Sequence, residues 1–194
     1  ECCKKNEISF LSSVFSIPDA MLLIDIGCNE VKIPSFESRN HELISYCNEN
    51  FKTVILSSGT STFEEIKESV KLIDRAKLFL MHCVSVYPGE YFEANLPKML
   101  KLKSLCPNIG LSDHIEGVES SKIAIGEGAT IIEKHFTIDK NLPGRDNRFS
   151  ILPEQLKNLT DYIKNRTMML QDQGLGYNSK EIDSRTNYTG RFNG

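Results

Sequence analysis

Short apolar runs alternate along the chain with longer stretches of helical spacing. Six runs rich in β-branched and other apolar residues predict strands at residues 8–15, 30–36, 53–58, 78–86, 109–114 and 130–138. Helical spacing predicts helices at residues 18–27, 40–50, 63–73, 91–105, 117–126 and 153–163. A Ser61-x-x-Glu64 capping box is expected to begin the third helix. Buried strands separated by single helices predict an α/β fold with a parallel sheet.

Two α/β architectures fit this rhythm, an open doubly wound sheet and a closed (β/α)₈ barrel. The glycine fingerprint of a dinucleotide fold is absent, which disfavours the open sheet. Polar residues close all six predicted strands, and in a barrel the carboxyl ends of all strands meet at one mouth. These residues are Ser12, Ser13, Lys32, Ser35, Ser57, Ser58, His82, Ser85, Tyr87, Ser112, Asp113, His114, Glu133, Lys134 and His135. We therefore predict a partial TIM barrel of six βα units, equivalent to strands three to eight, without the first two.

Composition narrows the class of protein. The chain has 194 residues, of which 40% are hydrophobic and 25% charged, the balance of a globular protein. A net charge of -3 gives no broad basic field, so we expect no nucleic-acid partner. The apolar runs fall far short of the roughly 20 residues that span a membrane, so we expect no membrane partner. Six scattered cysteines without a CxxC motif predict a reducing, cytoplasmic location.

The two ends of the chain suggest a piece of a longer protein. Residues 1–7 carry no initiator Met and are typical of the last turns of a helix. Residues 1–173 are expected to form the partial barrel domain, and the polar residues 174–194 a linker to a further domain. Six units cannot close an eight-stranded barrel, so unpaired edges at residues 8–15 and 130–138 should make the isolated chain self-associate and lack activity.

Two kinds of chemistry are expected at the barrel mouth. His114 and His135 end consecutive strands, so both imidazoles could reach one metal ion, although such a pair is more often structural. Asp113 and Glu133 strengthen the metal interpretation modestly. One ammonium and five hydroxyls predict a site for a phosphate or a carboxylate. Any one of the serines could instead be structural, but the whole set favours an anion site. These residues are Lys32, Ser13, Ser35, Ser57, Ser85 and Ser112.

Two further motifs have competing interpretations. His82 and Cys83 are adjacent on a strand and point to opposite faces, so they cannot form a catalytic dyad, and Cys83 is interpreted as a packing residue. The turn Pro143-Gly144-Arg145-Asp146 follows the sixth predicted strand and could return Asp146 to the mouth. An ordinary turn without function explains these turn residues equally well.

Several ordered motifs make the chain resemble the sialic acid synthase family. They are Lys32-Ile33-Pro34-Ser35-Phe36-Glu37, His82-Cys83-Val84-Ser85-Val86-Tyr87-Pro88, Gly110-Leu111-Ser112-Asp113-His114, Glu133-Lys134-His135-Phe136-Thr137 and Pro143-Gly144-Arg145-Asp146. The resemblance covers residues 8 to about 170. It implies a (β/α)₈ barrel transferase that condenses phosphoenolpyruvate with an N-acetylated amino sugar and water. The products would be phosphate and a nine-carbon 2-keto sugar acid such as N-acetylneuraminate.

The resemblance also implies roles for individual residues. His114 and His135 would bind a divalent metal, Mn²⁺ or Mg²⁺, and Tyr87 and Asp146 would contact the sugar. Phosphoenolpyruvate would be held by Lys32, Ser13, Ser35, Ser57, Ser85 and Ser112, with Lys32, Glu37 and Glu133 at the reacting centre. The family further implies a homodimer and a C-terminal antifreeze-like domain after the linker.

Three departures from the family pattern and two alternatives remain. Val14 and Ile115 stand where Pro and Thr are usual in the family, and Arg145 replaces the second Pro of a Pro-Gly-Pro-Asp turn.

One alternative function is that of a non-catalytic barrel that binds sugar phosphates. The other is a different aldolase-like synthase that uses phosphoenolpyruvate, such as the related enzyme that begins aromatic amino-acid synthesis. The sequence does not distinguish the acceptor sugars of sialic, legionaminic and pseudaminic acid synthesis.

Overall fold

A computed structural model of the chain describes residues 1–192 and contains one parallel sheet of five strands. The strands are β1 (Glu30–Ile33), β2 (Thr53–Ser57), β3 (Leu78–Cys83), β4 (Ile109–Asp113) and β5 (Ile131–Lys134). Their spatial order follows their order in the sequence, from β1 to β5. Each right-handed crossover therefore places its helix on the same side of the sheet, as in a barrel, whereas a doubly wound sheet reverses its order. The predicted parallel α/β sheet is confirmed.

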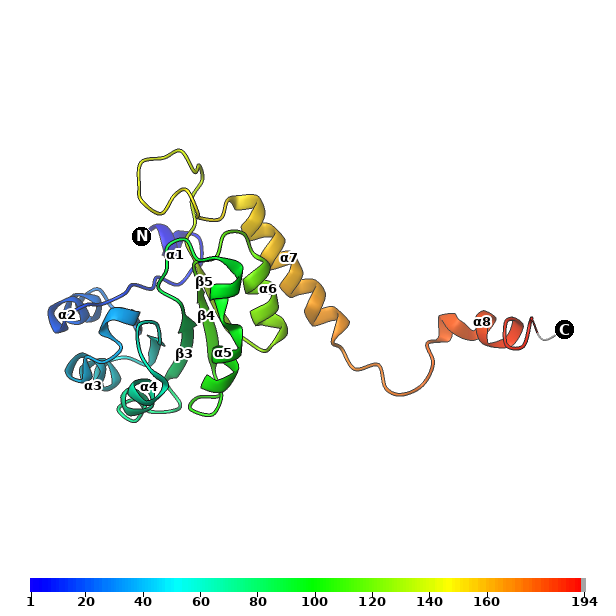
Figure 1. The fold of residues 1–194 in the computed structure, drawn as a ribbon, viewed down its shortest axis with the longest axis horizontal. Coiled ribbons are helices and arrows are strands. Elements are labelled where there is room, and N and C mark those ends of the chain that lie inside the picture. The colour runs from blue at the N-terminus through cyan, green and yellow to red at the C-terminus, as the bar shows by residue number, and fades with distance from the viewer. Residues whose placement is uncertain (193–194) are drawn as a thin grey trace.

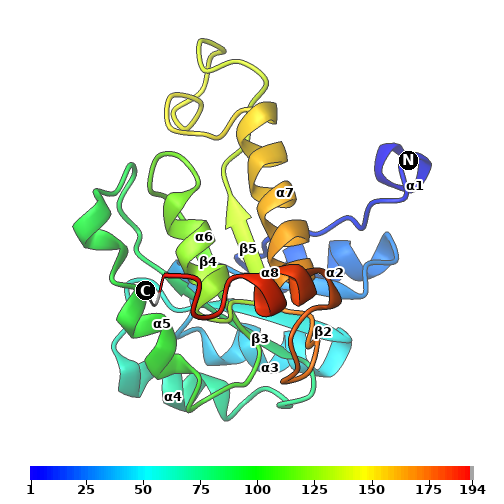
Figure 2. The same cartoon turned by 90° about the vertical axis from the view of Figure 1, so that its right-hand side faces the viewer.

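Helices cover the outer side of this curved sheet (Figure 1). The covering helices are α2 (Ile17–Asp25), α3 (His41–Asn50), α4 (Phe63–Val70), α5 (Leu96–Leu102), α6 (Glu119–Gly126) and α7 (Pro153–Met169). Two short helices near the ends of the chain, α1 (Cys2–Lys5) and α8 (Ile182–Asn187), have no buried residues. Three short 3₁₀ helices span Ser35–Glu37, Tyr91–Ala94 and Ser179–Glu181. The loop between β5 and α7 rises beyond the carboxyl end of β5 (Figure 2). None of the helices among residues 1–192 is long and apolar enough to cross a membrane.

Strand residues alternate between the helix-covered face and the inner face of the curved sheet. Val31, Leu56 and Leu80 are buried in the main hydrophobic core on the outer face. Paired residues of neighbouring parallel strands share a face, so the row Cys83↔Ser112↔Glu133 faces inward as one unit. The period-two alternation therefore places one set of residues in the helix-covered core and the other on the inner face, which is apolar at Ile55 and Met81 and polar toward the carboxyl ends of the strands.

The first predicted strand, residues 8–15, is not a regular strand. It meets β1 at a single bridge between Ser13 and Lys32, supported by two backbone hydrogen bonds of 3.0 and 3.1 Å. Ile8 and Phe10 are exposed, because β1 begins only at Glu30 and gives the preceding residues no partner to pair with. The prediction of six strands was therefore wrong by one in the described chain.

Several predicted boundaries also shift. The strands at 30–36, 78–86 and 130–138 end earlier, and the helix at 91–105 divides at Asn95, whose backbone is left-handed with φ of 42°. The capping box uses Thr62 and Glu65 instead of Ser61 and Glu64. Ser61 is unavailable because its buried hydroxyl lies 2.7 Å from the Ser38 hydroxyl, a contact between residues distant in sequence.

The predicted linker at residues 174–194 contains helical turns. An extended segment after α7 leads to the last 3₁₀ helix and to α8, which lie away from the body of the molecule in Figure 1. All described residues after Leu170 are exposed, in keeping with their polar composition. The last two residues of the predicted linker, Asn193 and Gly194, lie outside the described residues.

Candidate functional site

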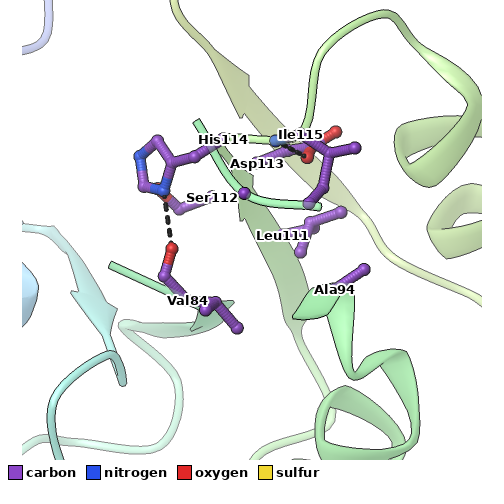
Figure 3. Close-up of a pocket in the computed structure, with 8 residues that line it drawn as sticks. Val84, Ala94, Leu111, Ser112, Asp113, His114 and Ile115 are labelled. Carbon is purple, nitrogen blue, oxygen red and sulfur yellow. Dashed lines mark hydrogen bonds between the residues drawn. The ribbon is translucent and has the colours of Figure 1, made fainter. Parts of the chain in front are cut away.

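Two histidines meet at the carboxyl ends of β4 and β5. The ring centroids of His114 and His135 lie 5.4 Å apart, on the inner side of the sheet. His114 donates from Nδ1 to the Val84 carbonyl at 2.9 Å (Figure 3), which leaves the lone pair of a neutral ring on Nε2. The Nδ1 atom of His135 lies 3.5 Å from the Asp146 carboxylate. Each imidazole is thus oriented through one nitrogen and leaves the other for a ligand.

The two imidazoles have different electrostatic environments. Burial disfavours the charged form of His114, but hydrogen bonds with Cys83 and Val84 outweigh it, so the pKa of His114 is raised above 6.5. Burial lowers the pKa of His135, and the neighbouring charge of His114 lowers it further. The surroundings therefore favour the protonated form at His114 and the neutral form at His135.

An ion pair faces these histidines from across the inner surface. The Lys32 ammonium of β1 lies 2.6 Å from the Glu133 carboxylate of β5, although these strands are the two ends of the sheet. The curvature of the sheet is what allows this contact. Glu133 also lines a small cavity of about 80 Å³ together with His114, Lys134 and His135. Lys32 and Glu133 thus join the histidine pair in one polar centre.

A second cluster surrounds Gly59 at the end of β2. The Gly59 backbone N–H donates to the Ser35 hydroxyl at 3.1 Å. A Cβ atom on Gly59 would lie 2.5 Å from the Ser35 hydroxyl oxygen and 2.6 Å from that of Ser85. Glycine is therefore required here so that these two hydroxyls can approach the backbone. The Gly59 N–H orients the Ser35 hydroxyl, and the neighbouring hydroxyls of Ser35 and Ser85 are donors suited to an anion.

The other predicted serines occupy the same inner surface. Ser57 ends β2, and its fully buried hydroxyl has no hydrogen-bond partner among residues 1–192. Ser112 is buried on β4 between Cys83 and Glu133. Ser13 is half-buried and bridges to Lys32. A buried hydroxyl without a partner is costly, so Ser57 in particular is suited to a ligand oxygen.

Tyr87 and Asp146 border the histidine pair on its open side. The Tyr87 ring centroid lies 4.2 Å from that of His114 and 6.1 Å from that of His135. A cavity of about 460 Å³ beside them is lined by Tyr87, Arg145, Asp146, Arg148 and Phe149. This cavity is large enough for a small polar molecule. The turn at residues 143–146 does return Asp146 to the mouth, as the turn sequence allowed.

Glu37 lies apart from this centre. Its carboxylate accepts a hydrogen bond of 2.8 Å from the side chain of Asn40, the residue that caps α3. No hydrogen bond or ion pair within residues 1–192 connects Glu37 to the histidines or to Lys32. Its assignment to the reacting centre therefore stays a prediction.

Three residues expected at the mouth point to the opposite face. His82 is completely buried and its Nε2 lies 2.8 Å from the Ala94 carbonyl, under the helices. Asp113 and Lys134 are paired in the strand register and form a buried ion pair of 3.2 Å on the helix side. Because strand side chains alternate, these three residues are excluded from the inner surface that His114 and His135 occupy. Asp113 therefore cannot assist a metal ion at the mouth.

The buried His82 should make folding stability depend on pH. Burial lowers its pKa below 6.5, so as the pH falls below 6.5 the unfolded chain takes up a proton first. The contribution of His82 to the free energy of unfolding should therefore decline between pH 6.5 and the folded-state pKa, and remain level above 6.5. His82→Gln should flatten this decline in urea unfolding at a series of pH values, whereas exposed His41→Gln should not. Equal slopes for His82→Gln and the parent protein would contradict the prediction.

Cys83 and Phe149 belong to the site but were not predicted. The Cys83 thiol lies 3.9 Å from Nδ1 of His114 and 3.7 Å from the Ser85 hydroxyl, so it connects the two clusters. Phe149 packs its ring 5.3 Å from His135. Cys83 could have been identified from strand alternation, since it shares a face with the strand-end serines, but no local signal marks Phe149.

The imidazole nitrogens of the two histidines are suitable donor atoms for a divalent metal ion. Within the described chain, no three His, Cys, Asp or Glu side chains lie close enough to hold an ion by themselves. A two-imidazole set would leave several coordination positions to water or substrate oxygens, as catalytic sites need.

Comparison with known proteins identifies the family of this chain. Residues 1–174 match the NeuB family. The chain is 37% identical over 167 residues to the N,N'-diacetyllegionaminic acid synthase of Campylobacter jejuni, covering 83% of this chain and 50% of that protein. It is 34% identical to the pseudaminic acid synthase of Helicobacter pylori, covering 95% of this chain and 56% of that one. The chain thus spans about half the length of the curated relatives it matches.

Solved structures with a similar fold include a member of the same group of synthases. The N-acetylneuraminic acid (sialic acid) synthetase of Leptospira borgpetersenii, crystallised with citrate, has a TM-score of 0.83 and 33% identity, covering 98% of this chain and 67% of that one. A truncated 3-deoxy-D-arabino-heptulosonate 7-phosphate synthase of Thermotoga maritima has a TM-score of 0.73 at 18% identity, covering 86% of this chain and 68% of that one, which extends the likeness of fold alone. The predicted family resemblance is confirmed, and this chain belongs to the NeuB family.

Proposed function

We propose that this chain forms the catalytic mouth of a synthase that condenses phosphoenolpyruvate with an N-acetylated amino sugar. C3 of phosphoenolpyruvate attacks the aldehyde carbon of the open-chain sugar and forms the new carbon–carbon bond. Water then adds at C2, and the tetrahedral intermediate expels inorganic phosphate. The aldehyde oxygen takes up a proton, and the product is a nine-carbon 2-keto sugar acid. Relatives named as legionaminic and pseudaminic acid synthases support this class of acceptor.

Phosphoenolpyruvate is held on the inner surface. The Lys32 ammonium supplies a point charge for an anionic oxygen, and the hydroxyls of the serine cluster donate hydrogen bonds. The cluster comprises Ser13, Ser35, Ser57, Ser85 and Ser112. These donors stabilise the negative charge that develops on the departing phosphate, since they are aimed before the reaction begins.

His114 and His135 would hold a divalent metal ion, Mn²⁺ or Mg²⁺, through the nitrogens that their contacts with Val84 and Asp146 leave free. When bound, such an ion supplies Lewis acidity toward the sugar aldehyde. Tyr87 and Asp146, which border the cavity beside the histidines, orient the sugar. Glu133 is the carboxylate beside Lys32 and is suited to accept a proton from the water that adds at C2. Glu37 is retained as a second catalytic carboxylate.

One observation gives the main support for the proposed function. The Lys32–Glu133 ion pair, with N and O 2.6 Å apart, lies on the same inner surface as the two histidines, so an anion site and a metal-ligand pair meet at one point. A non-catalytic barrel that only binds sugar phosphates would have no need of two imidazoles oriented in this way.

A substrate screen tests the proposal. Full-length protein is incubated with phosphoenolpyruvate, Mn²⁺ and each candidate amino sugar, and phosphate release is measured together with product mass. Release with one acceptor is the expected result and identifies the sugar. Calorimetric binding of phosphoenolpyruvate without turnover on any acceptor would favour the non-catalytic barrel. Turnover with a sugar phosphate such as erythrose 4-phosphate would favour the other phosphoenolpyruvate-dependent synthase.

Three further proposals concern the whole protein. The 194 residues alone should self-associate and show no turnover, because β1 and β5 leave backbone groups unpaired along the outer edges of the sheet, where another chain can pair. Residues 1–173 act as the barrel domain, with residues 174–194 leading to an antifreeze-like domain. The full-length protein is a cytoplasmic homodimer.

Gly59→Ala should weaken phosphoenolpyruvate binding. The new Cβ would lie within 2.6 Å of both the Ser35 and Ser85 hydroxyls, so these donors must move away from the bound anion. Losing one or two good hydrogen bonds to a charged group costs about 1.5–3 kcal/mol, so we expect KM to rise about ten-fold or more. In the control Gly126→Ala, the Cβ would meet only the Tyr162 hydroxyl at 3.8 Å. Steady-state kinetics check this, and an unchanged KM in Gly59→Ala would contradict the assignment.

A further inference from the structure

A buried polar cluster lies on the helix side of the sheet, directly behind the two histidines. The Asp113 carboxylate accepts hydrogen bonds from the Ser120 and Ser121 hydroxyls at 2.7 and 2.6 Å and from the Ile115 N–H at 3.0 Å. The Lys134 ammonium lies 3.2 Å from the same carboxylate and donates to the Ile115 carbonyl. The side chains of Asp113 and Lys134 are 1% and 5% exposed, so the cluster is closed to solvent.

This cluster is connected to both histidines by the chain itself. Asp113 and Ile115 flank His114, and Lys134 precedes His135. Figure 3 shows the His114 ring directed away from Asp113, toward Val84. Because neighbouring strand residues point to opposite faces, each contact behind the sheet fixes the backbone from which a histidine projects in front of it. Asp113 and Lys134 are also register partners, so their ion pair connects β4 and β5 at the last paired residues.

The cluster is more elaborate than packing requires. A buried ion pair brings little net stability compared with apolar residues of the same size, because both charges lose their hydration. Here the carboxylate is surrounded by four donors from three places: the N-terminal turn of α6, the turn after β4, and β5. Such a set has defined directions, whereas apolar packing does not, so it can hold two strand ends at one separation.

We infer that Asp113, Lys134, Ser120 and Ser121 are positioning residues that set the spacing of His114 and His135 for one metal ion. The inference rests on the proposed metal pair. None of the four residues touches substrate. Their effect is on the distance and angle between the two imidazoles, so their loss should weaken metal binding more than it weakens phosphoenolpyruvate binding at Lys32.

Calorimetric titration of Mn²⁺ into the metal-free full-length protein tests this, with phosphoenolpyruvate titrations beside it. Ser121→Ala removes one donor to Asp113 and leaves the ion pair, and Lys134→Gln removes the cation. Changes around metal ligands commonly cost 10- to 100-fold in metal affinity, so we expect about ten-fold for each variant. Lys134→Arg, which keeps the charge, should recover most of the loss. Phosphoenolpyruvate affinity should change less than two- to three-fold.

Ser69→Ala is the matched control, since Ser69 and Ser121 are both helical serines with no exposed surface. Ser69 donates to the Ser38 carbonyl at 2.6 Å, far from β5. If Ser121→Ala and Ser69→Ala lower the melting temperature alike and only Ser121→Ala weakens Mn²⁺ binding, the inference is supported. If both bind Mn²⁺ as the parent does, or both weaken alike, the inference is wrong. A parent protein that binds no divalent metal would instead refute the proposed metal pair itself.

Discussion

Replacing His135 with alanine is expected to abolish specific Mn²⁺ binding in the full-length protein and to reduce turnover to near background. His114 and His135 supply the two imidazole nitrogens that meet at this mouth, with ring centroids 5.4 Å apart. Even changes next to metal ligands cost 10- to 100-fold in affinity, so loss of a ligand itself should cost at least about 100-fold. The loss would be in metal affinity and turnover, with binding of phosphoenolpyruvate largely retained.

His135→Phe separates this effect from packing. The His135 ring stands edge-on to the rings of Tyr87 and Phe149, and phenylalanine keeps an aromatic ring there without a ligand nitrogen. We expect His135→Phe to fold with a melting temperature near that of the parent and still bind no Mn²⁺. Electron paramagnetic resonance of Mn²⁺ gives the free and bound fractions directly. Parent-like Mn²⁺ affinity in His135→Phe would remove His135 from the metal site.

Lys32→Ala is expected to have the opposite signature, weaker phosphoenolpyruvate binding with nearly unchanged metal affinity. Lys32 is 8% exposed on β1, and its ammonium lies 2.6 Å from the Glu133 carboxylate. A hydrogen bond to a charged group is worth about 1.5–3 kcal/mol. This corresponds to roughly a 10- to 150-fold rise in the Kd for phosphoenolpyruvate.

Glu133→Gln provides the informative partner variant. It removes the carboxylate 2.6 Å from Lys32 and so frees the ammonium for an anionic ligand. We expect phosphoenolpyruvate to bind Glu133→Gln at least as tightly as the parent, while turnover falls because the proton acceptor is lost. Exposed Lys157→Ala controls for net charge. Calorimetric titrations of phosphoenolpyruvate and Mn²⁺ into Lys32→Ala, Glu133→Gln and Lys157→Ala measure both affinities. An equal loss of Mn²⁺ affinity in Lys32→Ala and His135→Ala would contradict separate roles for Lys32 and His135.

The order of the elements and the type of chemistry are predictable from local sequence patterns. Period-two and helical spacing located every strand of the sheet, since local burial patterns report which face of an element is covered. Strand alternation also indicated that His82 and Cys83 could not act together. The strand-end residues Lys32, His114 and His135 were recognisable because polar groups that close apolar strands have few structural reasons to be there.

Which strand-end residues share a surface depends on the assembled sheet. Asp113 and Lys134 were predicted to lie at the mouth. They are register partners on the helix side of the sheet, where Ser121 of α6 donates a hydrogen bond to Asp113. The contact between Lys32 and Glu133 depends on the curvature that brings the two ends of the sheet together. Residues 8–15 have strand character in the sequence but lack a neighbour to pair with over most of their length. Pairing, curvature and face depend on groups distant in the chain, and a local pattern carries no information about those groups.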